Sequence, residues 1–160
     1  MDKYLLTDEI IFDSKPDAVP YNYRISYKMS QIALIIGMCC NGRSGCTLVK
    51  LHIIANALNT KKYMDDLESY VNDRMPYILV RFDPAINRAV KYALADEVIC
   101  QLKNGSFKLT EKGKQLVRLI KKDDELMEQE KEYLTRIGYK LNPEKLERLT
   151  STWRYTNAEN

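Results

Sequence analysis

The chain has 160 residues, of which 45% are hydrophobic and 29% charged, a composition that supports a folded core and excludes a disordered polar tract. No apolar run reaches the roughly 18 residues of a membrane span. The acidic start, MDKYLLTDEI, lacks a secretion-type pattern, so we expect a cytoplasmic protein. The net charge of +3 is uneven, because residues 81–122 carry ten Lys or Arg against four Asp or Glu. This basic middle favours an acidic partner, either nucleic acid or the carboxylates of another protein.

The first half of the chain predicts an arm, three helices and a strand. Residues 1–25 contain two prolines and several aspartates and are typical of an extended arm. The stretch YKMSQIALIIGMCC, with Ser26 or Ser30 as its cap, predicts a central core helix because it is apolar on nearly every side. Thr47 is placed to cap a second helix, and KKYMDDLESYVND predicts a third. YILVRF, residues 77–82, predicts a strand.

The next part of the chain predicts a helix, a hairpin and another helix. The Asp-Pro pair at 83–84 suits the cap and first position of a helix. The Asn-Gly pair at 104–105, between VICQLK and SFKLT, predicts a β-hairpin because both residues tolerate positive φ. Thr110 is placed to cap the following helix, and Gly113 in its first turn lets that helix lie close to the hairpin.

The last part predicts helices. Residues 121–141 favour one charged amphipathic helix, with Leu126, Tyr133 and Ile137 on one side and Gly138 at its end. A final helix begins at Pro143 and aligns three apolar side chains, Leu146, Leu149 and Trp153.

This order of elements predicts a mainly α fold with a small β-hairpin, namely a decorated winged helix-turn-helix with a C-terminal helical extension. We expect an N-terminal arm over residues 1–25, a winged-helix core with an inserted helix over 26–122, and the extension over 123–160. In such folds the helix before the hairpin reads the DNA major groove, and the hairpin adds phosphate contacts. The polar residues placed for these contacts are Asn87, Arg88, Lys91, Lys103, Lys108, Lys112 and Lys114. The alternative is an ordinary solvated surface, or one that meets an acidic protein.

The sequence offers little that predicts catalysis. No phosphate-binding G-x-x-x-x-G-K-S/T loop and no G-x-S-x-G motif is present. The only histidine, His52, is expected to be a packed or partly exposed helix residue. We expect the four cysteines, Cys39, Cys40, Cys46 and Cys100, to be reduced and buried. A metal site using Cys46 and His52 with Cys39 or Cys40 would lack paired C-x-x-C knuckles, so we predict no metal, no cofactor and no enzymatic activity.

One segment carries a family resemblance. TLVKLHIIANALNTKKYMDDLESYV, residues 47–71, resembles a recurring segment in the middle components of bacterial ABC-three-component systems. It is also similar to the small accessory subunit of Lamassu-type anti-phage defence. In those proteins a basic-Leu-His-hydrophobic-hydrophobic stretch, here residues 50–54, leads to an Ala-Leu helix end, here residues 57–58. A later winged-helix half, here 78–119, also fits the family.

The resemblance implies a non-enzymatic winged-helix subunit, encoded beside an SMC-like ATPase and an effector, often a nuclease. Such a subunit sits on the ATPase and helps to hold or release the effector. The stripe of Leu146, Leu149 and Trp153 is a candidate contact with a partner's coiled coil, and the alternative is that it folds back on its own domain. A second hypothesis is a winged-helix transcriptional regulator that binds operator DNA. A third is a small adaptor with no role on nucleic acid.

Overall fold

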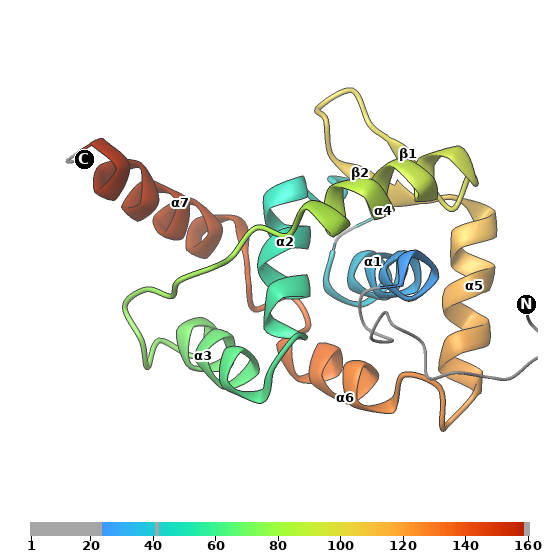
Figure 1. Ribbon diagram of the computed structural model, residues 1–160, viewed down its shortest axis with the longest axis horizontal. Coiled ribbons are helices and arrows are strands. Elements are labelled where there is room, and N and C mark those ends of the chain that lie inside the picture. Colours follow the sequence, from blue (N-terminus) through green and yellow to red (C-terminus); the bar gives the residue numbers. More distant parts are fainter. Residues whose placement is uncertain (1–23, 41, 159–160) are drawn as a thin grey trace, which may run out of the picture.

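The computed structural model describes residues 24–40 and 42–158, so nearly all of the predicted arm lies outside the described residues. Within the described part the protein is mainly helical, with one small two-stranded antiparallel sheet (Figure 1). The elements in chain order are α1 (Ile25–Cys39), α2 (Leu48–Ala57), α3 (Lys61–Val71), α4 (Pro84–Ala95), β1 (Ile99–Gln101), β2 (Phe107–Leu109), α5 (Glu111–Lys122), α6 (Glu128–Ile137) and α7 (Pro143–Ala158).

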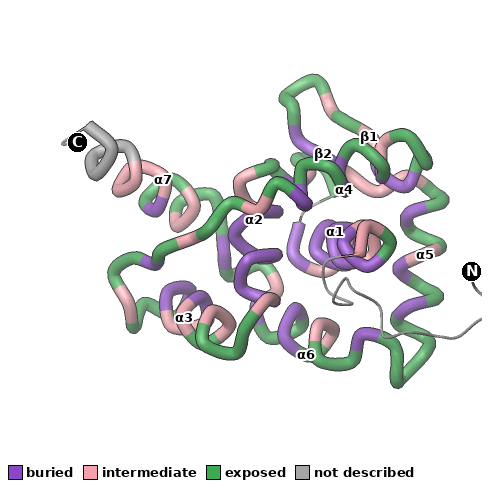
Figure 2. Tube along the Cα trace, in the orientation of Figure 1, coloured by how far each residue is buried: buried purple, intermediate pink, exposed green. Residues whose placement is uncertain are grey.

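Helix α1 lies at the centre of the molecule, as its apolar sequence predicts. It contacts α2, α4, α5, α6 and β2, and Figure 2 shows it mostly buried. Ile32, Leu34 and Ile35 have no exposed surface. The predicted cap is wrong: Arg24 precedes the first turn with no side-chain cap, and the Ser30 hydroxyl donates to the Ser26 carbonyl within the helix, at 3.0 Å. The helix therefore begins without the predicted side-chain cap.

The hairpin forms as the Asn-Gly pair predicts. Strand β1 pairs with β2 in an antiparallel register that places Ile99 opposite Leu109. Cys46 adds a bridge on the other edge of β2, where its N–H donates to the Phe107 carbonyl at 2.7 Å and its carbonyl accepts from the Phe107 N–H at 2.8 Å. A Cβ on Gly113 would stand 2.0 Å from the Val98 carbonyl oxygen, which confirms that the glycine lets α5 approach the hairpin.

Three predicted helix starts are confirmed. The Thr47 hydroxyl accepts from the Lys50 N–H at 3.2 Å, and the Thr110 hydroxyl accepts from the Gly113 N–H at 3.1 Å. At α4 the Asp83 carboxylate accepts from the Ala85 N–H at 2.9 Å, with a proline in the first helical turn. Each cap joins residues two or three apart, so the local sequence is enough to specify it.

The predicted strand at 77–82 is wrong. These residues are extended, but no strand lies beside them in the described structure, because the small sheet is formed elsewhere by the hairpin. Two side chains take the place of a neighbouring strand. The Arg81 N–H donates to the Asn56 side-chain oxygen at 3.3 Å, and the Trp153 indole N–H donates to the Ile78 carbonyl at 3.4 Å. We call residues 77–82 the linker segment.

The single helix predicted from Lys121 to Gly138 is wrong in its first part, whereas its end at Gly138 is confirmed, because Gly138 directly follows α6. Helix α5 ends at Lys122, and α6 begins only at Glu128. The Asp123 carboxylate accepts from the N–H groups of Glu125 and Leu126 at 3.0 and 3.2 Å, which turns the chain after α5. An aspartate that bonds its own following backbone competes in this way with helix continuation.

Residues 123–153 share the core of the rest of the domain. The Cys39 thiol donates to the Leu134 carbonyl at 3.7 Å, and the Tyr133 hydroxyl donates to the Met64 carbonyl at 3.0 Å. The predicted C-terminal extension therefore adds to one continuous core that also contains α1. None of the described helices is long and apolar enough to cross a membrane.

Candidate functional site

The outer face of α4 carries the residues predicted to read DNA. Asn87, Arg88 and Lys91 are exposed there, together with Tyr92. Arg88 and Lys91 have no ion-pair partner among the described residues. Asn87 differs, because its side-chain oxygen lies 2.9 Å from Nε2 of the buried His52. Since an amide oxygen only accepts, the proton is on Nε2 of the imidazole, and Asn87 is held against α2.

The predicted lysines of the hairpin and α5 do not form one surface. Lys103 is exposed in the turn of the hairpin, which projects beyond α4 (Figure 1). Lys112 donates to the Asp96 carbonyl at 2.7 Å, and Lys114 pairs with Glu111 at 3.1 Å. Lys108 and Lys114 instead line a hollow beside the end of α1. Of the predicted DNA-contacting cations, Arg88, Lys91 and Lys103 are therefore the ones placed to meet an acidic partner on the α4 side.

The apolar stripe of α7 packs on its own domain. Leu149 is 1% exposed, and Leu146 and Trp153 are partly buried against the core. The Trp153 ring also meets the Phe82 ring edge-on, with centroids 5.7 Å apart. Of the two alternatives for this stripe, the structure displays the second, in which it folds back on its own domain and meets the linker segment and the core. A contact of these three residues with a partner stays a prediction.

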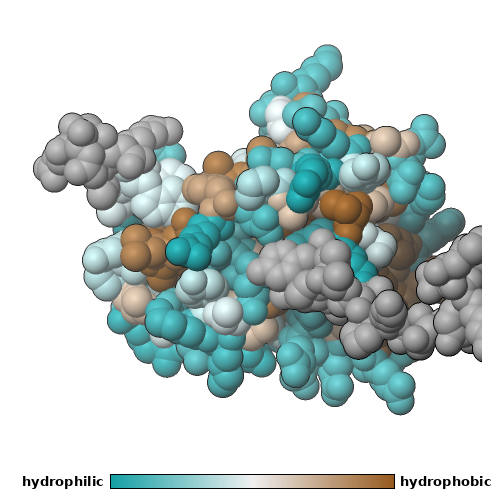
Figure 3. All heavy atoms as spheres, viewed as in Figure 1, coloured by the Kyte–Doolittle hydropathy of each residue, from teal (hydrophilic) through white to brown (hydrophobic). Residues whose placement is uncertain are grey.

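The linker segment carries the most exposed of the large hydrophobic residues in the described structure. Leu79 is 82% exposed, and Tyr77 and Phe82 are each 51% exposed. Figure 3 shows apolar atoms at the surface between α3 and α7, where this segment runs. No hydrogen bond among the described residues uses the N–H groups of Tyr77, Leu79 or Val80. Exposed apolar side chains beside unpaired extended backbone are typical of a surface that accepts another chain.

One side of the linker segment is fixed to the domain by a row of rings. The Phe82 ring lies between His52 and Trp153, and its centroid is 4.9 Å from that of His52 in an edge-on arrangement. Ile78, which is part of the segment, is itself buried. Because α2 and α7 hold this side, the segment keeps its extended shape while its other edge stays open.

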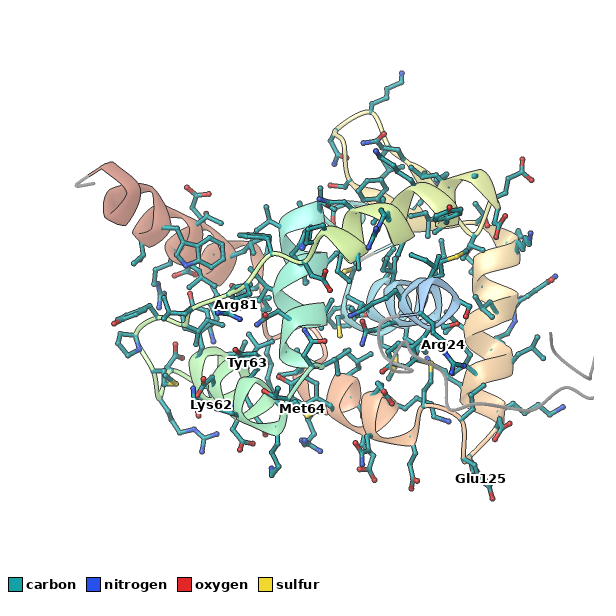
Figure 4. All side chains as sticks on the ribbon, viewed as in Figure 1. Arg24, Lys62, Tyr63, Met64, Arg81 and Glu125 are labelled. Atoms are coloured by element: carbon teal, nitrogen blue, oxygen red, sulfur yellow. The ribbon has the colours of Figure 1, made fainter. Side chains whose placement is uncertain are left out.

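A hollow of about 630 Å³ lies between the linker segment and α3. Figure 4 labels Lys62 and Tyr63 on α3 and Arg81 on the segment, all of which line it. Lys62 pairs with Asp66 at 2.8 Å across an exposed turn of α3, whereas Arg81 has no ion-pair partner in the described part of the chain. The remaining lining residues are Asp66, Met75, Pro76, Tyr77, Ile78 and Leu79. This mixture of apolar side chains with the Arg81 cation suits a peptide segment better than a small charged metabolite.

A buried cation joins α1 to the start of α4. The Lys28 side chain has no exposed surface, and its ammonium lies 3.7 Å from the Asp83 carboxylate. Burial lowers the pKa of Lys28, and the attraction of Asp83 opposes that shift. Asp83 also caps α4, so the ion pair ties the start of that helix to the core helix.

No family model, no curated protein and no solved structure matches this chain. Among the residues that the structure describes, no three His, Cys, Asp or Glu side chains are grouped so as to hold a metal ion. The linker segment is a site that the sequence reasoning missed. Its signal was the bracketing by Pro76 and Pro84, since two prolines isolate an apolar stretch from regular elements.

Proposed function

We propose that this chain is a cytoplasmic, non-enzymatic accessory subunit that docks on a partner protein through the linker segment. The observation that carries the proposal is the exposure of Leu79, Tyr77 and Phe82 on extended backbone with an open edge. Leaving so much apolar surface in water is unfavourable by about 25 cal/mol per Å², and a docked partner removes that cost.

The arrangement of elements supports a winged-helix interpretation of the fold. Helix α1, the bridging residue Cys46, α2, α4 and the β1–β2 hairpin follow one another in the order of that fold, with α3 as an insertion. The bridge on β2 corresponds to the short first strand of a winged helix. In this interpretation α4 is the helix next to the wing, and the linker segment leads directly into it.

The resemblance of residues 47–71 supplies the kind of partner. We propose an SMC-like ATPase in a bacterial anti-phage defence complex, which this subunit links to a nuclease-type effector. The resembling stretch includes His52, which holds both Phe82 of the linker segment and Asn87 of α4. The segment of the chain that carries the resemblance therefore also supports the proposed docking surface.

Co-expression with the proteins encoded beside this chain tests the proposal. We expect a tagged chain to co-purify stoichiometrically with an SMC-like ATPase. Leu79→Asp should weaken that association by about 2 kcal/mol or more, roughly thirtyfold in affinity. The matched control is Leu119→Asp on α5, since Leu119 is 66% exposed but lies on a different element. Equal capture of both variants would show that the linker segment is not the docking surface.

A second candidate function is DNA binding by a regulator. The exposed cations Arg88, Lys91 and Lys103 on α4 and the hairpin favour it. Replacing Arg88 and Lys91 with Ala should weaken binding to a preferred duplex, because each good base contact contributes about 1–3 kcal/mol of discrimination. A uniform small decrease in affinity for every duplex would indicate phosphate contact only. Unchanged affinity for every duplex would remove this function.

A further inference from the structure

Three of the four cysteines gather at the end of α1. Cys39 closes the helix, Cys40 follows it, and Cys46 pairs through its backbone with Phe107 of β2. Cys40 and Cys46 are 6% and 0% exposed. Cys40 and Cys46 lie close enough for each to shift the pKa of the other, and both are free cysteines.

The two adjacent cysteines at this helix end have opposite acid–base properties. The hydrogen bond from Cys46 lowers the pKa of Cys40 against the effect of burial, and the Lys50 cation adds to the lowering. Lys50 is held in place because its ammonium donates to the Cys39 carbonyl at 2.8 Å. Burial instead raises the pKa of Cys39 to about 12. Since the thiolate is the nucleophile, Cys40 is the reactive member of this pair.

Of the three cysteines at the end of α1, Cys40 is the one that lines a hollow at the surface. It lines a hollow of about 350 Å³ between the end of α1, β2 and the start of α5. Two cations, Lys108 and Lys114, line the same hollow, as does the exposed Tyr139. The hollow therefore favours a small anionic molecule next to the Cys40 sulfur.

We propose that Cys40 is a thiol–disulfide exchange site for anionic low-molecular-weight disulfides, with Cys46 as the resolving thiol. The Cys40 thiolate attacks one sulfur of the disulfide, whose S–S bond breaks, and the departing thiolate takes up a proton. Cys46 then loses its proton to solvent and attacks the Cys40 sulfur, which releases the second small thiol. The two protein thiols are oxidised by two electrons, and one small disulfide is reduced to two thiols.

The product bond would tie the end of α1 to the segment that pairs with β2. Because Cys46 bridges Phe107, an oxidised pair would fix the hairpin relative to the core helix. This site uses none of the residues of the linker segment. A negative result for the cysteines would therefore leave the proposed docking unaffected, and the reverse also holds.

The experiment treats the reduced full-length chain with oxidised glutathione and maps every cysteine by peptide mass spectrometry after acid quenching. We expect a glutathione adduct on Cys40 first and then a Cys40–Cys46 disulfide, with Cys39 unmodified. In the untreated native protein, alkylation of Cys40 should be about tenfold or more faster than that of Cys39. Cys46→Ala should stop the reaction at the Cys40 adduct, whereas the control Cys100→Ala should change nothing.

A neutral reagent sharpens the test. Lys108→Ala should slow the reaction with oxidised glutathione but not with the uncharged hydroxyethyl disulfide, because only the former gains from the cation. The proposal is overturned if Cys40 in the native wild-type protein reacts no faster than Cys39, or if glutathione is found on Cys100 alone. These readings on the wild-type protein do not depend on the folding of any variant.

Discussion

Helix α1 and the linker segment are both apolar in sequence, yet they lie at opposite extremes of burial. Leu34 and Ile35 of α1 have no exposed surface, whereas Leu79 of the linker segment is 82% exposed. A helix satisfies its backbone hydrogen bonds internally, so neighbours can cover it on every side. An extended segment with no neighbouring strand keeps unpaired N–H and C=O groups on its open edge, and these need water or another chain. Apolar content therefore marks the core in one region and, in our proposal, a binding surface in the other.

The largest loss of stability should come from a substitution in the buried helix α1. Ile35→Ala removes a fully buried side chain from α1 and leaves a cavity, so we expect a decrease of about 2–5 kcal/mol in the free energy of unfolding. Urea unfolding followed by circular dichroism measures it. A decrease below about 1 kcal/mol would mean that α1 is not the centre of the packed core.

A smaller effect should follow from forcing α5 away from the hairpin. In Gly113→Ala the new Cβ would overlap the Val98 carbonyl oxygen, which belongs to the backbone and cannot simply turn aside. We expect the free energy of unfolding to fall by about 1–3 kcal/mol, measured by the same urea titration. Gly42→Ala is the matched control, because a Cβ there meets nothing within 4 Å. Equal stability of the two variants would contradict the close approach of α5.

The buried Cys39 at the end of α1 should also make the folded state less stable at alkaline pH. Because burial raises the pKa of Cys39 from 9.0 to about 12, the folded state keeps a proton that the unfolded state loses. The contribution of the Cys39 thiol to the free energy of unfolding is complete below pH 9. It is lost as pH rises from 9 toward 12, by at most about 1.4 kcal/mol per pH unit.

Cys39→Ala should make the free energy of unfolding decrease less steeply as pH rises above 9. The difference in unfolding free energy between wild type and variant isolates Cys39, because Cys46 and Tyr133, whose pKa values are also raised, contribute to both proteins. Parallel pH profiles for the two proteins would show that the Cys39 thiol is not protonated by burial as described.

The smallest effect on stability should come from the linker segment. Leu79→Ala removes a side chain that is mostly in water, so the free energy of unfolding should change by no more than about 0.5 kcal/mol. Thermal unfolding of the isolated chain measures it. A decrease comparable to that of Ile35→Ala would mean that Leu79 is a core residue, and the contrast between the two regions would disappear.

The parts of the fold that depend on local chemistry could be predicted from the sequence. Thr47, Thr110 and Asp83 each cap a helix through residues two or three positions away, and the Asn-Gly pair at 104–105 forms its hairpin. The basic residues of α4 are exposed for the same reason, since helical periodicity separates its two faces.

The parts that depend on distant partners could not be predicted. The linker segment has the residues of a strand, but a strand requires a neighbour, and Asn56 and Trp153 occupy that place. The stripe on α7 has the pattern of a partner surface, but Trp153 meets Phe82 of the linker segment, far earlier in the chain, in a contact that no local pattern reveals. His52 likewise joins α2 to α4 through Asn87 over a long sequence separation.

The central claim is that the linker segment is an open edge that a partner covers, and amide hydrogen exchange tests it most directly. In the isolated chain the amides of Leu79 and Val80 should exchange rapidly, while those in the middle of α1 stay protected. In a purified complex with the proposed SMC-like ATPase the same two amides should become protected. Slow exchange of Leu79 and Val80 in the isolated chain, or unchanged fast exchange in the complex, would contradict the account.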